Sequence, residues 1–298
     1  MNSAPAWYVT SFYRFLRFRG EGLNELKSVT KSWMAEREMT GLVLFAEEGI
    51  NGTVSGTAAH VADFKRFICD LVGEDDIRFK DSVSEVPPFH RLTVDVRGEI
   101  VGMKRPDLSP DTTEDHHLSP KEWHEALTSP GPKLVIDTRN RYETTVGKFK
   151  DAIDPDLKTF SEWGAYLEKA EIPEDVPVYI YCTGGIRCEK AILEMRSRGL
   201  ENVFQLRDGI LGYLQEYPDG LFDGDCFVFD DRVALDHDLR PSGRFGICPG
   251  CGLTASKGLV CQRCAGAYFV CDACEGDWGP VCSKKCRDLW QRHGPSKG

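Results

Sequence analysis

The feature that most constrains the fold is an alternation of short apolar segments and helical segments in the middle of the chain. The apolar segments read "KLVIDTR", "VPVYIYC" and "ENVFQL", and the segments between and after them are "FSEWGAYLEKA", "CEKAILEMRSRG" and "GILGYLQEY". Such alternation predicts a parallel β-sheet with helices on both faces. Ligands of these sheets bind at the carboxyl ends of strands, and Cys182 ends one of the predicted strands.

The segment that follows Cys182 is suited to holding a negative charge. It reads "TGGIR", and we expect Gly184 and Gly185 to adopt unusual backbone angles that turn the loop amides inward. With the charge of Arg187, these groups predict an exposed, activated cysteine whose pKa falls from about 8.5 to between about 3.5 and 7.5. The competing interpretation is a buried cysteine that merely ends a strand. Cys188 begins the next helix, and it either resolves an oxidised Cys182 or packs in the core.

Residues 1–105 have a different pattern. Segments such as "WYVTSFYRF", "GLVLFAEEGINGTVSG", "IRFKDSV" and "RLTVDVRGEIV" are strand-like, whereas "GLNELKSVTKSWMAERE" and "AAHVADFKRFICDLVG" have helical spacing. The order β-α-β-β-α-β predicts a ferredoxin-like α+β sandwich. Cys69 lies in the second helix and is interpreted as a small buried hydrophobe.

Residues 106–132 are interpreted as a linker that runs into a helix. The stretch is rich in Pro, Asp and Thr, and Ser119 can cap a helix that has Pro120 at its first position. His116 and His117 are adjacent and do not share a helix face, so we expect a solvated linker and assign them no role. The parallel α/β domain then covers residues 133–240.

Residues 241–298 carry eight cysteines in the pattern C-x2-C-x9-C-x2-C-x6-C-x2-C-x7-C-x3-C. The candidate metal ligands are Cys248, Cys251, Cys261, Cys264, Cys271, Cys274, Cys282 and Cys286. Because four thiolates can hold one tetrahedral ion, the pattern predicts two structural zinc ions that supply most of the folding energy. Disulfides and an iron–sulfur cluster are the minor alternatives. Cross-braced and sequential pairing of the cysteine pairs both stay open.

The formal net charge of −10 is unevenly distributed. Residues 106–240 carry 15 basic and 28 acidic side chains, whereas residues 241–298 carry 8 and 4. The acidic excess predicts a solvated surface and does not indicate a nucleic-acid partner, although the two ends can form local basic surfaces. No apolar run approaches about 18 residues and no signal-peptide pattern is present, so we expect a cytoplasmic protein with no membrane partner. The sequence does not indicate the oligomeric state.

The cysteine loop resembles the active-site loop of the rhodanese family. Cys182 to Arg187 forms C-x4-R, one residue shorter than the C-x5-R loop of tyrosine-type phosphatases, which suits sulfur or a small adduct better than phosphate. The family pattern D-x-R-x3-E-x3-G-x-F-x2-A falls on Asp137, Arg139, Glu143, Gly147, Phe149 and Ala152. We expect Asp137 and Arg139 to fix a loop by an ion pair and to do no chemistry.

A longer resemblance covers residues 7 to about 240. The stretches "LFAEEGINGTVSG", "PPFHRLTVDVRGEIVGM", "YCTGGIRCEKA" and "GDCFVFDDRVAL" together resemble the rhodanese-domain tRNA uridine hydroxylase family. This resemblance implies oxygen-dependent hydroxylation of the tRNA wobble uridine at C5, with molecular oxygen as co-substrate and Cys182 as the active-site cysteine. Addition of a thiolate to uracil C6 would make C5 an enolate carbon, and Arg187 with the loop amides would stabilise the anion.

A tRNA partner requires a basic docking surface, which the acidic middle domain does not offer. The candidate RNA-binding residues are Arg14, Arg17, Arg19, Lys27 and Lys31 near the N-terminus, and Lys284 and Lys285 in the tail. Two other functions stay open at this point. One is a rhodanese-type sulfurtransferase or persulfide carrier, and the other is a non-catalytic, zinc-stabilised RNA-binding adaptor, which the presence of Cys182 disfavours.

Overall fold

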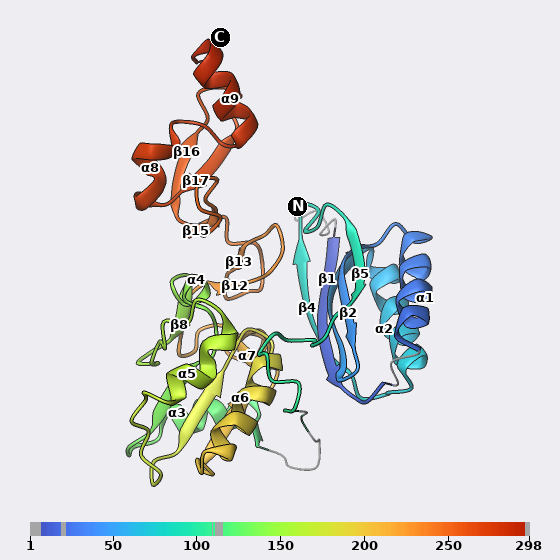
Figure 1. The fold of residues 1–298 in the computed structure, drawn as a ribbon, viewed down its shortest axis with the longest axis vertical. Coiled ribbons are helices and arrows are strands. Elements are labelled where there is room, and N and C mark those ends of the chain that lie inside the picture. The colour runs from blue at the N-terminus through green and yellow to red at the C-terminus, as the bar shows by residue number, and fades with distance from the viewer. Residues whose placement is uncertain (1–6, 19–21, 109, 111–115, 296–298) are drawn as a thin grey trace.

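The computed structural model describes residues 7–18, 22–108, 110 and 116–295. Figure 1 shows an N-terminal sheet backed by two helices, a central α/β region, and a small C-terminal region that extends away from both. Side chains of the first two regions contact each other directly; the Tyr13 hydroxyl, for example, donates a hydrogen bond to Glu189.

The N-terminal domain is a five-stranded sheet with two helices. Its elements are β1 (Trp7–Phe15), α1 (Leu23–Ala35), β2 (Thr40–Ala46), β3 (Gly49–Gly56), α2 (Ala58–Val72), β4 (Arg78–Ser84) and β5 (Leu92–Val96). The strand order is β4-β1-β3-β2-β5, with antiparallel pairing except between β2 and β5. This confirms the ferredoxin-like α+β sandwich, which β5 extends at one edge.

Both helices of this domain cover the same face of its sheet (Figure 1). Phe12 of β1, Phe45 of β2 and Phe64 of α2 are buried together in one core. Because successive side chains of a strand point to opposite faces, Ser11 and Tyr13 lie on the other face. That face is turned toward the central domain, where both residues line a cavity.

The central domain is built on a four-stranded sheet in the order β6-β10-β9-β7. Its elements are β6 (His117–Leu118), α3 (Pro120–Thr128), β7 (Leu134–Asp137), α4 (Arg141–Thr144), β8 (Gly147–Phe149), η2 (Phe160–Glu162), α5 (Trp163–Leu167), β9 (Val178–Tyr181), α6 (Ile186–Ser197), β10 (Val203–Leu206) and α7 (Gly209–Glu216). The paired strands of this sheet are all parallel, as the alternating pattern predicts. Trp123 of α3 and Trp163 of α5 are fully buried in the separate cores on its two faces.

The segment before this domain corrects one prediction. Ser119 caps α3 and Pro120 opens it, as expected. The expectation that His116 and His117 lie in a solvated linker is wrong, because His117 belongs to β6 and pairs in parallel with β10. The Nε2 atom of His117 lies 2.9 Å from a carboxylate oxygen of the buried Glu189. The pairing partner of this two-residue strand is distant in sequence, so the local pattern does not reveal it.

The C-terminal region consists of short antiparallel strand pairs and two helices. The elements are β11 (Phe222–Gly224), β12 (Cys226–Phe227), β13 (Ala234–Leu235), β14 (Gly246–Ile247), β15 (Thr254–Ala255), β16 (Lys257–Val260), β17 (Ala267–Val270), α8 (Asp272–Trp278) and α9 (Lys284–His293). β11 pairs with β8 of the central domain. The small core of the last part combines cysteine and aromatic side chains, with Val270 and Val281 among its few aliphatic members. Apolar burial alone is therefore a weak source of stability there.

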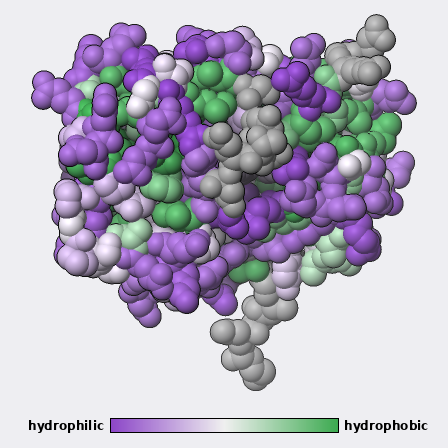
Figure 2. All heavy atoms as spheres, turned by 90° about the horizontal axis from the view of Figure 1, so that it is seen from below, coloured by the Kyte–Doolittle hydropathy of each residue, from purple (hydrophilic) through white to green (hydrophobic). Residues whose placement is uncertain are grey.

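Hydrophilic residues cover most of the molecular face in Figure 2, and apolar residues gather in smaller groups between them. This agrees with a solvated surface on that face. Among the residues that the structure describes, no helix combines the length and apolar character needed to cross a membrane.

Candidate functional site

Cys182 directly follows β9 and precedes α6, so it lies at the carboxyl end of a central strand, as the sequence predicts. The turn into α6 is made by Gly185, whose φ is +101°. Gly184 does not have a positive φ, so the expectation of unusual backbone angles holds for Gly185 alone. The Gly185 amide donates a hydrogen bond to the Cys182 sulfur at 3.1 Å, which confirms that the loop amides face the thiol.

The loop favours the thiolate form of Cys182. Burial by itself would raise the pKa, but a hydrogen bond from the Cys188 thiol, the charge of Arg187 and the amides of Arg187 and Gly185 oppose it. The result is a pKa lowered to about 5. The sulfur is therefore a nucleophile at neutral pH, as expected for a cysteine in an amide nest beside a helix N-terminus.

The predicted exposure of Cys182 is wrong, because the residue is completely buried. The N-terminal sheet covers the loop, and the two domains enclose a cavity of about 450 Å³ that Cys182 lines. This volume is within the range of about 300–1,000 Å³ that is typical of small-molecule sites.

Cys188 lies in the first turn of α6 and is completely buried in the core beneath the loop. Its pKa is raised well above the ordinary value by burial and by its hydrogen bond to Cys182. Its sulfur also lies 3.6 Å from the Thr138 hydroxyl oxygen. Cys188 therefore packs in the core and also stabilises the Cys182 thiolate by a hydrogen bond. Its role in resolving an oxidised Cys182 stays a prediction.

Arg187 does not face the cavity as a free cation. Its guanidinium donates hydrogen bonds of 2.5 and 2.8 Å to the two carboxylate oxygens of Glu143, which is fully buried. Glu143 also accepts a hydrogen bond from the Asn140 amide at the start of α4. The sequence pattern identified Glu143 as a family position but did not reveal this pairing, which brings together residues 44 positions apart. Arg187 thus acts on the sulfur as part of a buried ion pair.

Asp137 and Arg139 form the expected ion pair. Both side chains are fully buried, and the Arg139 guanidinium donates hydrogen bonds to the Asp137 carboxylate and to the Gly147 carbonyl oxygen. The pair therefore joins the end of β7 to β8.

Several residues of the N-terminal domain line the cavity, among them Tyr13 of β1 and Lys80 of β4, which the sequence did not indicate. A Cβ atom added to Gly185 would lie 2.8 Å from the Tyr13 hydroxyl oxygen, and one added to Gly184 would lie 3.9 Å from Cε of Lys80. These side chains therefore rest directly on the cysteine loop. Strand alternation would have placed them on the sheet face away from the helices, but it does not show what that face meets.

Phe229 is another cavity residue that the sequence did not indicate. It lines the cavity together with Cys182, and 62% of its surface is exposed. Its ring lies 5.7 Å from the Arg187 guanidinium. An exposed aromatic ring at the edge of a cavity can stack on a nucleobase.

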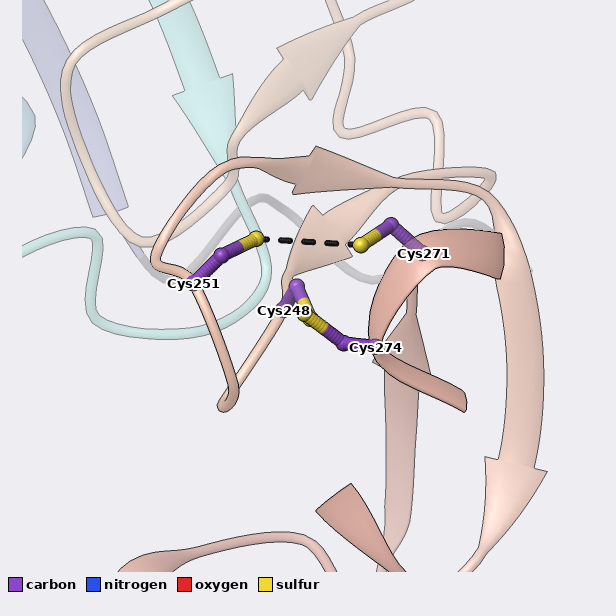
Figure 3. A group of neighbouring side chains, drawn as sticks. All are labelled: Cys248, Cys251, Cys271 and Cys274. Carbon is purple, nitrogen blue, oxygen red and sulfur yellow. Dashed lines mark hydrogen bonds between the residues drawn. The ribbon is translucent and has the colours of Figure 1, made fainter. Parts of the chain in front are cut away.

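The eight tail cysteines form two groups of four. Within each group the sulfur atoms lie within 4.8 Å of one another: Cys248, Cys251, Cys271 and Cys274 in one, and Cys261, Cys264, Cys282 and Cys286 in the other. Figure 3 shows the first group, in which the side chains converge from the β14 turn and from the start of α8. The first and third cysteine pairs along the chain make one group, and the second and fourth make the other. This is the cross-braced arrangement.

The geometry of these groups fits a tetrahedral metal ion. The Cys251 and Cys271 sulfurs are 3.7 Å apart, and those of Cys264 and Cys282 are 3.5 Å apart. Zn–S bonds of about 2.3 Å place tetrahedral sulfur ligands roughly 3.8 Å apart. Burial would raise the pKa of Cys248, but backbone amides, including that of Gly250, lower it to about 6, which favours the ligating thiolate.

The N-terminal candidates for RNA binding lie in different surroundings. Arg14 pairs with Glu74 and Asp76 at 3.1 and 3.0 Å. Lys27 and Lys31 belong to α1, on the sheet face that points away from the cavity. These side chains therefore do not lie over the cysteine loop.

Of the remaining candidates, those that the structure describes do not line the cavity. Arg17 is exposed, and Arg19 lies outside the described residues. Lys284 and Lys285 are exposed on α9, which Figure 1 places at the far end of the molecule from α6. RNA binding by any of them stays a prediction.

Comparison with known proteins identifies the family. Family models match in sequence order: UPF0176 acylphosphatase like domain over residues 7–100, Rhodanese-like domain over 119–216 and Rhodanase C-terminal over 223–287. A protein of Bdellovibrio bacteriovorus named tRNA uridine(34) hydroxylase is 40% identical over 301 residues, which cover 100% of this chain and 85% of that protein. This chain belongs to the tRNA uridine(34) hydroxylase family. A second member, from Acaryochloris marina, is 40% identical over 269 residues, or 86% of each chain.

Among solved structures, the chain is similar to a rhodanese-like domain from Anabaena sp., with a TM-score of 0.31, 18% identity, and coverage of 37% of this chain and 80% of that one. The hydroxylase family expected from the sequence is confirmed. The rhodanese match includes Cys182 and Arg187, and the C-terminal match includes the eight tail cysteines. That last match begins at residue 223, upstream of the boundary at 241 that we predict, and the domain boundaries stay predictions.

Proposed function

We propose that this chain hydroxylates the wobble uridine of tRNA at C5 to 5-hydroxyuridine, with molecular oxygen as co-substrate. The strongest support is the state and position of Cys182. Its pKa is lowered to about 5, which favours the thiolate, and it lines a cavity large enough for a nucleobase. A member of the same family that is 40% identical carries the name of this activity.

In the proposed reaction Cys182 is the nucleophile. Its sulfur adds to C6 of the uracil ring, and the electron pair of the C5–C6 double bond moves toward the C4 carbonyl, so that C5 becomes an enolate carbon. The amides of Gly185 and Arg187 and the thiol of Cys188 hold the sulfur as a thiolate before the addition. The cavity between the domains limits the access of water to the enolate.

We propose that the two tail groups hold one zinc ion each, through Cys248, Cys251, Cys271 and Cys274 and through Cys261, Cys264, Cys282 and Cys286. Zinc ligated by four thiolates is closed to substrate and acts structurally. It ties the short strand pairs and the two tail helices into one unit, which compensates for the small apolar core.

The partner in this proposal is tRNA, and the proposed location is the cytoplasm. The basic residues of the two ends remain the proposed phosphate contacts, and those that the structure describes lie outside the cavity. Phosphate contacts outside the cavity would orient the RNA while the target base enters it.

The test uses a strain that lacks the protein and receives either wild-type protein or Cys182→Ser. We expect 5-hydroxyuridine in tRNA nucleosides with wild-type protein and none with Cys182→Ser, because serine is a far weaker nucleophile. Cys69→Ser, which alters a partly buried cysteine outside the cavity, is the matched control and should retain the modification. Growth under isotopically labelled oxygen gas should add the label to the new hydroxyl group. Full modification by Cys182→Ser would refute the proposed nucleophile.

A further inference from the structure

Lys80 carries a buried ammonium group whose hydrogen-bonding capacity is unused. Its side chain is 3% exposed, and its Nζ atom has no hydrogen-bond partner among the described residues. An ammonium removed from water without an acceptor is costly, and such groups are rare in folded proteins. The side chain lines the cavity that contains Cys182. The arrangement indicates that an acceptor arrives with the substrate.

The groups that face Lys80 do not supply this acceptor. Asp208, at the start of α7, has its Oδ1 atom 3.9 Å from Nζ, beyond hydrogen-bond distance. The Asp208 carboxylate already accepts hydrogen bonds of 2.8 and 2.9 Å from Arg78 of β4. From β1, Tyr13 presents its ring 4.6 Å from Nζ, while its hydroxyl donates to Glu189 of α6.

The balance of these charges leaves Lys80 protonated at neutral pH, with a pKa only slightly above neutral. Burial lowers its pKa to about 8, and the nearby Arg78 lowers it as well. The charges of Asp208, Cys182 and Glu189 act in the opposite direction and limit the shift. A cation of this kind gains much from an anionic partner, because the partner restores the electrostatic stabilisation lost on burial.

We propose that Lys80 is a catalytic residue that binds the O4 oxygen of the target uracil and stabilises the enolate formed when Cys182 adds to C6. The inference rests on the proposed function and extends its site to the N-terminal domain. In this step the thiolate lone pair forms the S–C6 bond. The π pair of C5–C6 then forms the C5–C4 double bond, and the electrons of the C4 carbonyl bond move onto O4. Nothing is oxidised, and Lys80 donates a hydrogen bond to the negative oxygen.

Two observations favour a ring oxygen over a phosphate oxygen as the acceptor. Lys80 rests on the cysteine loop, since a Cβ atom at Gly184 would be 3.9 Å from its Cε. A ring attacked by the Cys182 sulfur therefore has its carbonyl groups close to Lys80. In addition, the ammonium is buried, whereas the phosphate backbone of a base that is flipped into a cavity stays at its entrance.

The test isolates the addition step from the oxygen chemistry. The substrate is tRNA with tritium at C5 of uridine 34, incubated with the full-length protein in the absence of oxygen. The enolate first takes a proton from water at C5. C5 then carries one hydrogen and one tritium, and loss of the tritium to water regenerates the enolate. The Cys182 sulfur finally leaves C6 and restores the C5–C6 double bond. Wild-type protein should release tritium, and Lys80→Met should release it about 10²–10³-fold more slowly, as for removal of an oxyanion-hole donor. Lys65→Met, which changes a lysine on the helix-covered side of the same domain, should match wild type.

Lys80→Arg separates a catalytic role from a structural one. Arginine keeps the charge and does not titrate below about pH 12. Tritium release by wild-type protein should fall as the pH rises through about 8, where Lys80 loses its proton. The arginine variant should keep measurable release and lose this alkaline decrease. A residue that only maintained the fold would not change the pH profile in this way.

Several results would overturn the proposal. Release by a folded Lys80→Met protein at the wild-type rate would do so, as would an unchanged alkaline decrease in Lys80→Arg. If Lys80→Met weakens tRNA binding but releases tritium normally from bound tRNA, the cation holds a phosphate and the assignment to O4 is wrong. Wild-type protein that makes 5-hydroxyuridine in cells but releases no tritium also excludes the enolate role. If cells with wild-type protein lack 5-hydroxyuridine, the proposed function itself fails, which is a separate result.

Discussion

At the scale of single residues, Cys182 combines two opposing influences. Complete burial disfavours its charged form, yet the Cys188 thiol, the charge of Arg187 and the amides of its loop reverse that effect. A buried thiolate is shielded from most solutes and reacts with what fits the cavity. Reactivity and protection therefore arise from the same arrangement.

The rate of alkylation at different pH values measures the pKa of Cys182 directly. We expect iodoacetamide to label Cys182 with a rate that is half-maximal near pH 5, because the thiolate is the reactive form and is present above its pKa. Cys69, whose pKa is raised by burial and nearby carboxylates, should react only at alkaline pH. Mass spectrometry of peptides from protein labelled across a pH series makes the comparison. Similar labelling of both cysteines at pH 6 would contradict the role of the loop amides.

At the scale of elements, the loop between β9 and α6 is the point where two domains meet. Its glycines have separate functions. Gly185 takes a left-handed backbone conformation and lies against the Tyr13 hydroxyl, whereas Gly184 has an ordinary conformation and more space. Lys190 of α6 strengthens the junction by pairing with Glu48 and Glu99 of the N-terminal region at 2.7 Å each.

Alanine substitutions distinguish the two glycines. Gly185→Ala forces a Cβ atom to within 2.8 Å of the Tyr13 oxygen and strains the positive φ, at a cost of roughly 1–2 kcal/mol for the backbone alone. We expect it to reduce 5-hydroxyuridine formation about tenfold or more, since each 1.4 kcal/mol of lost transition-state stabilisation is about tenfold in rate. Gly184→Ala keeps its amide and gains only an ordinary contact, so it should retain most activity. Equal loss in both variants would show that space and backbone angle do not explain the loop.

At the scale of the whole molecule, the cavity belongs to no single domain. Its floor is the cysteine loop of the central domain, and its cover is the face of the N-terminal sheet that the helices leave open. The cysteine-rich region extends away from the cavity (Figure 1) and contacts the central domain where the Thr254 hydroxyl donates a hydrogen bond to the Tyr142 carbonyl oxygen.

The tail provides a separate prediction. Purified protein should contain two zinc ions per chain by elemental analysis, and Cys286→Ala should reduce the content toward one by disabling one group. Removal of zinc with a chelator should unfold the tail, because bound metal would supply most of the stability of a region with so small an apolar core. The cavity should survive, so Cys182 should keep its alkylation profile. A tail that stays folded with no metal would contradict this prediction.

The sequence alone determined features that depend on neighbours along the chain. Apolar periodicity and turn residues are local, so they defined the two folded domains and placed Cys182 at the end of a strand. Metal-ligand spacing is also local, and it identified the eight thiolates. The family resemblance, which depends on long stretches of sequence, added the expected activity.

Only the tertiary structure decided what faces the cysteine. The packing of one domain on another buried Cys182, which the loop sequence had suggested would be exposed. The same packing places Lys80 and Tyr13 against a loop that is about 100 or more positions away in the sequence. Parallel pairing with β10 places His117 in a strand, where the sequence predicted a linker. Such contacts depend on which surfaces are complementary once folded, and that information is spread over both domains. A single strand or loop does not contain it.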